Sequence, residues 1–273
     1  MRQLTTLFII FLLTSCSNNE STKFNILISE TDSLRSILTS IYNGNWVQAN
    51  YVYDIVKTNS PYKSRDKLSA IVELNINAKD ANRETFEVGA PSIHEGTSFQ
   101  LFLKKGITTN AFVIDLKDYD NKTNFFELGY EIDNRDTCLL IYHFSKTNKL
   151  LDKEKYIKSS NNVGEGLQFV VNKKLIAGTY NLTDSSGQKS IVKFTENGNI
   201  SGVPGVTTYY ILTDFVAGPE NNLDQMCFDI QTKNQKCYGF QITGNTVSLY
   251  ELTEDEDHLN LNPSKLKYRF VRQ

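Results

Sequence analysis

The sequence predicts an all-β fold: two antiparallel meander modules, each a barrel or a sandwich, after one short N-terminal helix. Segments rich in β-branched and aromatic residues recur along the chain, and clusters of Gly, Asn and Asp separate them. Their spacing of about 8 to 14 residues favours antiparallel hairpins over βαβ units. The sequence therefore argues against parallel α/β folds and the nucleotide sites built on them.

The N-terminus has the layout of a signal peptide. Arg2 precedes an apolar run, and the small residues Thr14 and Ser15 follow it. The run is far shorter than the roughly 20 residues that a transmembrane helix needs. We therefore expect residues 1–15 to be removed and residues 16–30 to form a modified N-terminus and a short tether.

Leu13-Thr14-Ser15-Cys16 resembles the lipobox of bacterial lipoproteins, in which a Leu stands three residues before the Cys. The resemblance implies a diacylglyceryl group on the Cys16 sulfur, cleavage before this residue and acylation of the new amino terminus. It also implies a location in the cell envelope, anchored to the outer membrane where the bacterium has two membranes. The alternative is an ordinary secretory signal cleaved near Ser15, which leaves Cys16 as a thiol.

Charge argues against nucleic-acid binding. Of 29 basic residues only Arg2 lies in the predicted signal, so the mature chain has a net charge of -3. Its short basic runs, Lys104-Lys105 and Lys173-Lys174, are typical of solvated turns and form no basic stripe. The length suits two domains, predicted at 31–173 and 174–273.

One helix is predicted over Asp32–Ile41, where the apolar residues Leu34, Ile37, Leu38 and Ile41 follow helical spacing. Its apolar face is expected to plug or pack on the following sheet. Strands in the first domain are predicted over Trp46–Val56, Leu68–Asn77, Ser98–Lys104, Ala111–Leu116, Phe125–Ile132 and Thr137–Phe144. Strands in the second are predicted over Gly178–Thr183, Ser190–Thr195, Thr207–Phe215, Met226–Gln231, Lys236–Ile242, Thr246–Leu252 and Leu266–Arg272.

The two halves begin alike. Gly44-Asn45-Trp46 and Gly178-Thr179-Tyr180 each place a Gly two residues before a large aromatic residue. The chain here resembles lipocalin-like barrels, whose first strand opens with Gly-x-Trp after a short helix and whose last strand carries a basic residue. The resemblance implies that role for Arg269 or Arg272 in the second half. No basic terminal strand is assigned in the first half, and the second half has Tyr in place of Trp.

The cysteines suggest one disulfide. Cys227 and Cys237 flank a segment that turns near residues 231–234, so a hairpin would bring them together in an oxidising compartment. The alternative is two thiols on faces that never meet. Cys138 lies among apolar residues and is interpreted as a buried structural residue.

No catalytic or metal-binding motif is recognised, and no cofactor is predicted. The three histidines occur singly, at His94, His143 and His258. His143 is interpreted as a half-buried structural residue, and His94 lies in a Pro- and Gly-bounded loop. The acidic run 254–257 and the segment 118–121 lack the order of ligands found in calcium loops.

Two functions from different classes follow. The first is a non-catalytic binding or structural lipoprotein that presents a pocket or surface to a small apolar ligand, a glycan or an envelope protein. Its basis is the stock of 14 Tyr and 16 Phe, although most of these residues should form cores. The second is an envelope hydrolase or lyase that uses a loop carboxylate and a histidine such as His94.

Overall fold

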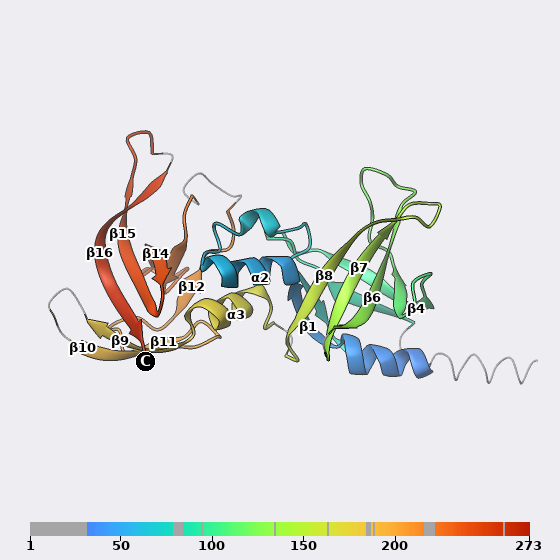
Figure 1. Cartoon of the computed structure of the whole chain (residues 1–273), viewed down its shortest axis with the longest axis horizontal. Coiled ribbons are helices and arrows are strands. Elements are labelled where there is room, and N and C mark those ends of the chain that lie inside the picture. The colour runs from blue at the N-terminus through green and yellow to red at the C-terminus, as the bar shows by residue number, and fades with distance from the viewer. Residues whose placement is uncertain are drawn as a thin grey trace, which may run out of the picture.

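Two β units lie one after the other along the long axis of the molecule (Figure 1). The structure is a computed structural model, and it describes residues 32–78, 84–93, 95–133, 135–162, 164–183, 187, 189–215, 222–258 and 260–273. The first unit is a closed antiparallel barrel and the second is an eight-stranded antiparallel sheet. The predicted all-β fold is confirmed. In the described part of the chain, no helix has the length and apolar character needed to cross a bilayer.

The barrel follows the chain in order, with each strand paired to the next and the last paired to the first. Successive residues of a strand face opposite sides of the barrel wall, so alternate side chains point into one interior. The strands are β1 (Gly44–Gln48), β2 (Glu73–Ile76), β3 (Thr85–Gly89), β4 (Ser98–Lys105), β5 (Ala111–Ile114), β6 (Phe125–Asp133), β7 (Asp136–Phe144) and β8 (Leu150–Ser160).

The N-terminal helix plugs this barrel. It comprises residues 32–37 and the π-helical turn η1 (Leu38–Tyr42), and its Leu34, Leu38 and Tyr42 join the barrel's buried cluster. The hydroxyl of Tyr42 donates to the carbonyl oxygen of Asn110, in the turn between β4 and β5, at 2.9 Å. The interior is thus a packed core closed by a helix, as the apolar face of that helix predicted.

The strand predicted over Trp46–Val56 is wrong beyond Gln48. The chain leaves β1 and forms helix α2 (Ala49–Thr58), which ends at Asn59 in the left-handed conformation. Tyr51, Val52 and Ile55 lie on one face of α2 and pack with residues of the second unit. Helical spacing of these residues competes with their β propensity, and burial against the second unit favours the helix. A short 3-10 turn, η2 (Arg65–Lys67), follows before β2.

The second unit contains strands in the order β11-β10-β9-β16-β15-β14-β13-β12. Their bounds are β9 (Gly178–Thr183), β10 (Lys189–Phe194), β11 (Ile200–Ser201), β12 (Tyr209–Ile211), β13 (Gln225–Phe228), β14 (Lys236–Thr243), β15 (Thr246–Glu254) and β16 (Leu261–Arg272). The two edges meet beside β11 and β12, where Asn199 bridges Thr208 and the amide of Tyr209 donates to the Gly198 carbonyl at 2.7 Å. The sheet therefore curls almost into a second barrel.

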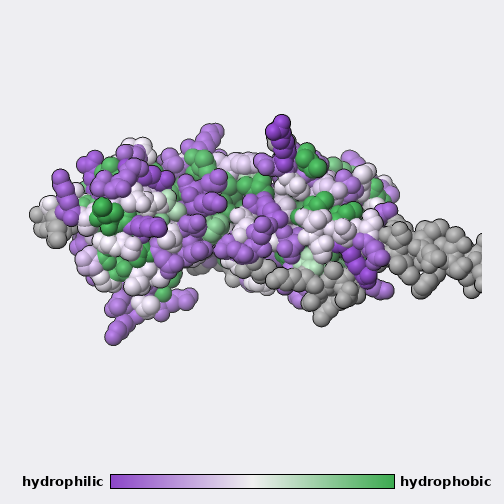
Figure 2. Space-filling view, turned by 90° about the horizontal axis from the view of Figure 1, so that it is seen from below, coloured by the Kyte–Doolittle hydropathy of each residue, from purple (hydrophilic) through white to green (hydrophobic). Residues whose placement is uncertain are grey.

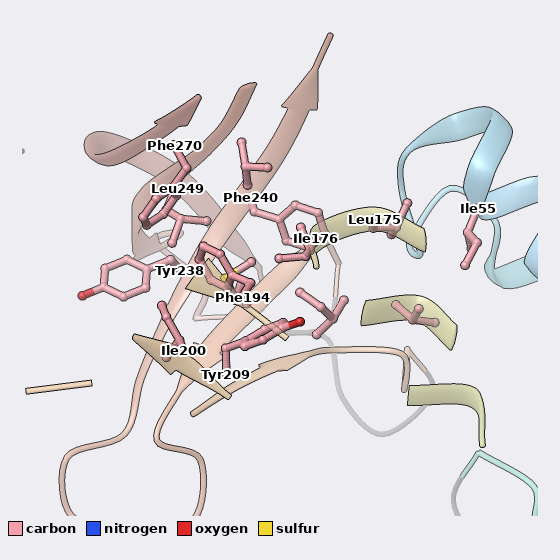
Figure 3. Packing of buried hydrophobic residues seen from close by; sticks show 14 of the residues in the cluster. Ile55, Leu175, Ile176, Phe194, Ile200, Tyr209, Tyr238, Phe240, Leu249 and Phe270 are labelled. Carbon is pink, nitrogen blue, oxygen red and sulfur yellow. The ribbon is translucent and has the colours of Figure 1, made fainter. Parts of the chain in front are cut away.

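A helical segment also packs against this second unit. It consists of α3 (Leu167–Val171) and the π-helical turn η4 (Asn172–Ile176). Leu175 of η4 lies between Ile55 of α2 and the aromatic residues of the sheet (Figure 3). Leu167, Val170 and Val171, which lie in the range predicted for the first domain, thus share the core of the second unit.

Both units open with the same local structure. Each five-residue π-helical turn is followed by an extended residue and then by a glycine with positive φ: Gly44 at 119° and Gly178 at 155°. The aromatic residue two positions later donates back to the turn, from Trp46 Nε1 to the Tyr42 carbonyl and from the Tyr180 hydroxyl to the Ile176 carbonyl. A Cβ on Gly44 would lie 2.6 Å from the Ser160 carbonyl oxygen, so only glycine fits there.

In each unit a cation lies beside the aromatic residue of this opening segment. The ammonium of Lys158, on β8, lies 5.2 Å from the ring of Trp46, and the guanidinium of Arg272, on β16, lies 5.2 Å from the ring of Tyr180. The structure thus selects Arg272 over Arg269 as the partner of Tyr180. It also supplies Lys158 as the equivalent residue of the first half, which the sequence did not reveal.

Candidate functional site

The candidate site is a hollow at the mouth of the first barrel, which we call the rim pocket. It has a volume of about 390 Å³ and lies between the N-terminal helix and the β4–β5 turn, residues 106–110. Sites for small molecules typically measure about 300 to 1,000 Å³. The pocket is lined by Leu34, Ile37, Lys105, Gly106, Ile107, Thr108, Thr109, Asn110, Ala111, Phe112 and Tyr130.

The walls of the rim pocket are mainly apolar. Leu34 and Ile37 come from the N-terminal helix, and Phe112 and Tyr130 come from barrel strands whose alternate residues face the interior. The Tyr42 ring packs edge-on against Phe112 and Tyr130, with ring centres 5.2 and 5.9 Å apart. These contacts fix the floor of the pocket. Apolar walls of this kind favour an apolar ligand.

A buried carboxylate fixes the β4–β5 turn. Glu127 is 1% exposed, and its two oxygens accept hydrogen bonds from the backbone amides of Ile107 at 2.6 Å and Thr108 at 3.0 Å. A Cβ on Gly106 would lie 2.4 Å from the Glu127 carboxyl carbon, so glycine allows this close approach. The turn is therefore a preformed wall of the rim pocket.

The predicted disulfide is confirmed. Cys227 on β13 and Cys237 on β14 lie directly opposite each other in the hairpin and are joined by a disulfide. The bond links two strands of the second unit near the turn between them. Its role in the structure is therefore to brace this hairpin.

Cys138 is buried on β7, as its apolar neighbours predicted. Burial raises the pKa of its thiol, so the protonated and weakly nucleophilic form prevails at neutral pH. The thiol lines an outer hollow of about 620 Å³ together with Lys155 and Lys158. The Lys155 ammonium donates to Asp133 at 2.6 Å, an ion pair that raises the pKa of the lysine.

His143 is held between two carboxylates. Its Nε2 lies 3.0 Å from an oxygen of Asp118 and its Nδ1 lies 3.3 Å from an oxygen of Asp152, while its ring stacks on Phe126 at 4.3 Å. Asp118 also accepts hydrogen bonds from the backbone amide of Asn121, the side-chain amide of Asn124 and the backbone amide of Asp120, and these hydrogen bonds lower the pKa of its carboxyl. The arrangement orders the loop before β6 and agrees with a half-buried structural histidine.

The remaining sequence candidates lie apart from the rim pocket. Cys16 and His94 fall outside the described residues. His258 pairs with Glu254 on the exposed β15–β16 loop. In the described ranges, no group of three or more His, Cys, Asp or Glu side chains is placed to hold a metal ion.

Sequence reasoning missed the rim pocket and its supporting carboxylate. The pocket joins residues from positions 34 to 130, and no local pattern links them. Glu127 offered one signal, because an acidic residue at a strand position between apolar neighbours needs a buried partner. The partner is a pair of backbone amides from a turn about 20 residues earlier.

Comparison with known proteins adds no relative from which a role could be carried over. No protein-family model, no curated protein sequence and no solved structure matches the chain.

Proposed function

We propose that the mature chain is a cell-envelope lipoprotein, held on its membrane through Cys16, whose first barrel binds a small apolar ligand without catalysing a reaction. The rim pocket carries the binding part of this proposal. Its walls are apolar, its volume suits a small molecule, and its turn is fixed before any ligand arrives. A preformed pocket avoids the cost of ordering its walls on binding.

The lipobox of residues 13–16 supports the anchoring part. Each buried methylene of an acyl chain contributes about 0.8 kcal/mol, so two or three chains hold a protein stably on a bilayer. Mass spectrometry of the N-terminal peptide should find an acylated Cys16, and Cys16→Ala should move the protein from the membrane fraction to the soluble fraction. A variant that stays in the membrane fraction would contradict the anchor.

Ligand binding is tested by calorimetry with dodecanoate, dodecanol and, as a polar control, maltose. Thr109 is exposed and lines the rim pocket, so Thr109→Trp should fill the pocket and weaken alkyl binding at least about tenfold. Thr253→Trp, at an exposed position on β15, is the matched control and should bind as the wild type does. Absence of alkyl binding, or equal binding by Thr109→Trp, would contradict the proposal.

A further inference from the structure

The β4–β5 turn presents an apolar tip flanked by lysines. Ile107 is 54% exposed at this tip, although large aliphatic side chains are usually buried. Lys104 and Lys105, at the end of β4, are also exposed. An apolar side chain beside cations suits the interface of a bilayer, where apolar groups enter the acyl boundary and cations meet anionic headgroups.

This tip is held rigidly. The Glu127 carboxylate binds the backbone amides of Ile107 and Thr108, and the Tyr42 hydroxyl binds the carbonyl of Asn110. These contacts use the backbone of the turn, and the Ile107 side chain is exposed. A fixed tip loses little conformational freedom when it meets a surface.

The tip also lies where the chain approaches the barrel from its N-terminal side. Leu34 and Ile37 of the N-terminal helix line the same pocket as Ile107. This helix, blue in Figure 1, extends away from the second unit. The 15 residues from Ser17 to Thr31 separate Cys16 from this helix, and fully extended they span at most about 55 Å. An anchor at Cys16 therefore keeps the N-terminal helix, and the turn beside it, within about 55 Å of the membrane.

Two other exposed aliphatic residues also lie beside lysines: Ile191 is 63% exposed on β10, and Leu150 is 45% exposed at the start of β8. The β4–β5 turn differs from both because Glu127 fixes its backbone and because it shares a pocket with the N-terminal helix. Figure 2 shows one face of the molecule. Hydrophobic residues form small patches there, over both units, and hydrophilic residues separate them. The mature chain is acidic overall, so general attraction to an anionic bilayer does not orient it. Orientation must come from a local feature.

We propose that the β4–β5 turn docks on the bilayer surface, with Ile107 in the interfacial region and Lys104 and Lys105 facing anionic phospholipid headgroups. The inference rests on the proposed anchor only for the proximity that the tether provides. A tethered contact of this kind becomes intramolecular, so a weak surface affinity is enough to set orientation. The rim pocket then opens toward the membrane.

The first test measures the surface contact without the anchor. The three buried clusters of the described residues begin at or after Leu34, so a chain that starts at Ser17 retains them. This chain should float with vesicles of phosphatidylglycerol and phosphatidylethanolamine, and less with vesicles of phosphatidylcholine. Ile107→Glu and the double variant Lys104→Glu/Lys105→Glu should each reduce the bound fraction at least about threefold.

Ile191→Glu is the matched control, because Ile191 is 63% exposed on β10 of the second unit. It should float as the wild type does, and all variants should show the wild-type unfolding curve. Equal flotation of Ile107→Glu and wild type, equal loss in Ile191→Glu, or no flotation of the wild type would overturn the docking proposal.

The second test uses the full acylated chain reconstituted in vesicles. A bimane probe on Ile107→Cys should be quenched by shallow spin-labelled lipids more strongly than the same probe on Ile191→Cys. Equal quenching would overturn docking even if the anchor is present. Failure of the anchor alone would instead show as retention of Cys16→Ala in the membrane fraction, with no acyl group on Cys16 of the wild type and the flotation result unchanged, so the two failures are distinguishable.

Discussion

The carboxylate of Glu127 accepts a hydrogen bond of 2.6 Å from the backbone amide of Ile107, which lies 20 residues earlier in the chain. This contact joins the wall of the first barrel to the turn that forms one side of the rim pocket. The buried charge is satisfied by two amides and keeps the turn in one conformation. The proposed ligand site and the proposed membrane contact both depend on it.

Replacing Glu127 should loosen this turn. Glu127→Leu removes both acceptors and leaves two amides unpaired, so the free energy of unfolding should fall by about 2 to 4 kcal/mol. Glu127→Gln retains one acceptor oxygen, so its free energy of unfolding should fall less than that of Glu127→Leu. Urea unfolding measures the stability, and hydrogen exchange of the Ile107 and Thr108 amides should quicken selectively. Glu87→Gln is the exposed control and should stay within about 0.5 kcal/mol of the wild type.

Arg272 should stabilise the start of the second unit. Its guanidinium donates to the Tyr180 hydroxyl, at 2.7 and 3.1 Å, and to the Leu175 carbonyl at 3.2 Å. Arg272→Ala should lower the free energy of unfolding by about 1 to 2 kcal/mol. Arg272→Lys should recover only part of this loss, because an ammonium lacks the planar, two-pronged geometry of the guanidinium. Arg269→Ala serves as the neighbouring control. Equal effects at both positions would argue against a specific role for Arg272.

The sequence predicted the elements whose pattern is local. The strand over Gly178–Thr183 was predicted with its observed bounds, because alternation places Tyr180 and Leu182 on the buried face between clear turns. The disulfide followed from hairpin spacing, and the plug helix followed from helical spacing.

Elements that depend on distant partners were missed. Strand β8 contains several charged residues, and two of them find their partners on β6, the strand beyond its neighbour β7: Lys153 pairs with Glu131 and Lys155 with Asp133. Helix α2 needs the second unit to bury its Ile55 face. The rim pocket forms only when the barrel closes, because its lining residues come from positions 34 to 130, so no single stretch of sequence predicts it.

The disulfide should contribute measurably to the stability of the second unit. Cys227 and Cys237 are 10 residues apart, and closing a loop of this size contributes about 2 to 3 kcal/mol through the unfolded state. The double variant Cys227→Ala/Cys237→Ala should unfold at correspondingly lower urea concentration. Reductant should lower the stability of the wild type and leave the double variant unchanged. If reductant leaves the stability of the wild type unchanged, the disulfide is absent from the protein in solution.

Asp224 should make the contact between the two units depend on pH. It accepts hydrogen bonds from the Ser60 hydroxyl and the Tyr62 amide, and burial raises the pKa of its carboxyl. The folded state thus holds this proton more tightly than the unfolded state does. Stability relative to Asp224→Asn should therefore fall as pH rises above about 4 and level off once the folded carboxyl is ionised.

Urea unfolding of both proteins across this pH range measures the difference. If stability relative to Asp224→Asn rises with pH, Asp224 is stabilised as an anion in the folded protein and the predicted sign is wrong.

Methyl NMR of the chain that starts at Ser17, titrated with dodecanoate, tests whether the mouth of the first barrel is a ligand site. We expect intermolecular nuclear Overhauser effects from the alkyl chain to the methyl groups of Leu34, Ile37 and Ile107, which line the rim pocket. Thr109→Trp should remove them. Contacts confined to methyl groups outside the pocket, or no contact at ligand saturation, would contradict the claim.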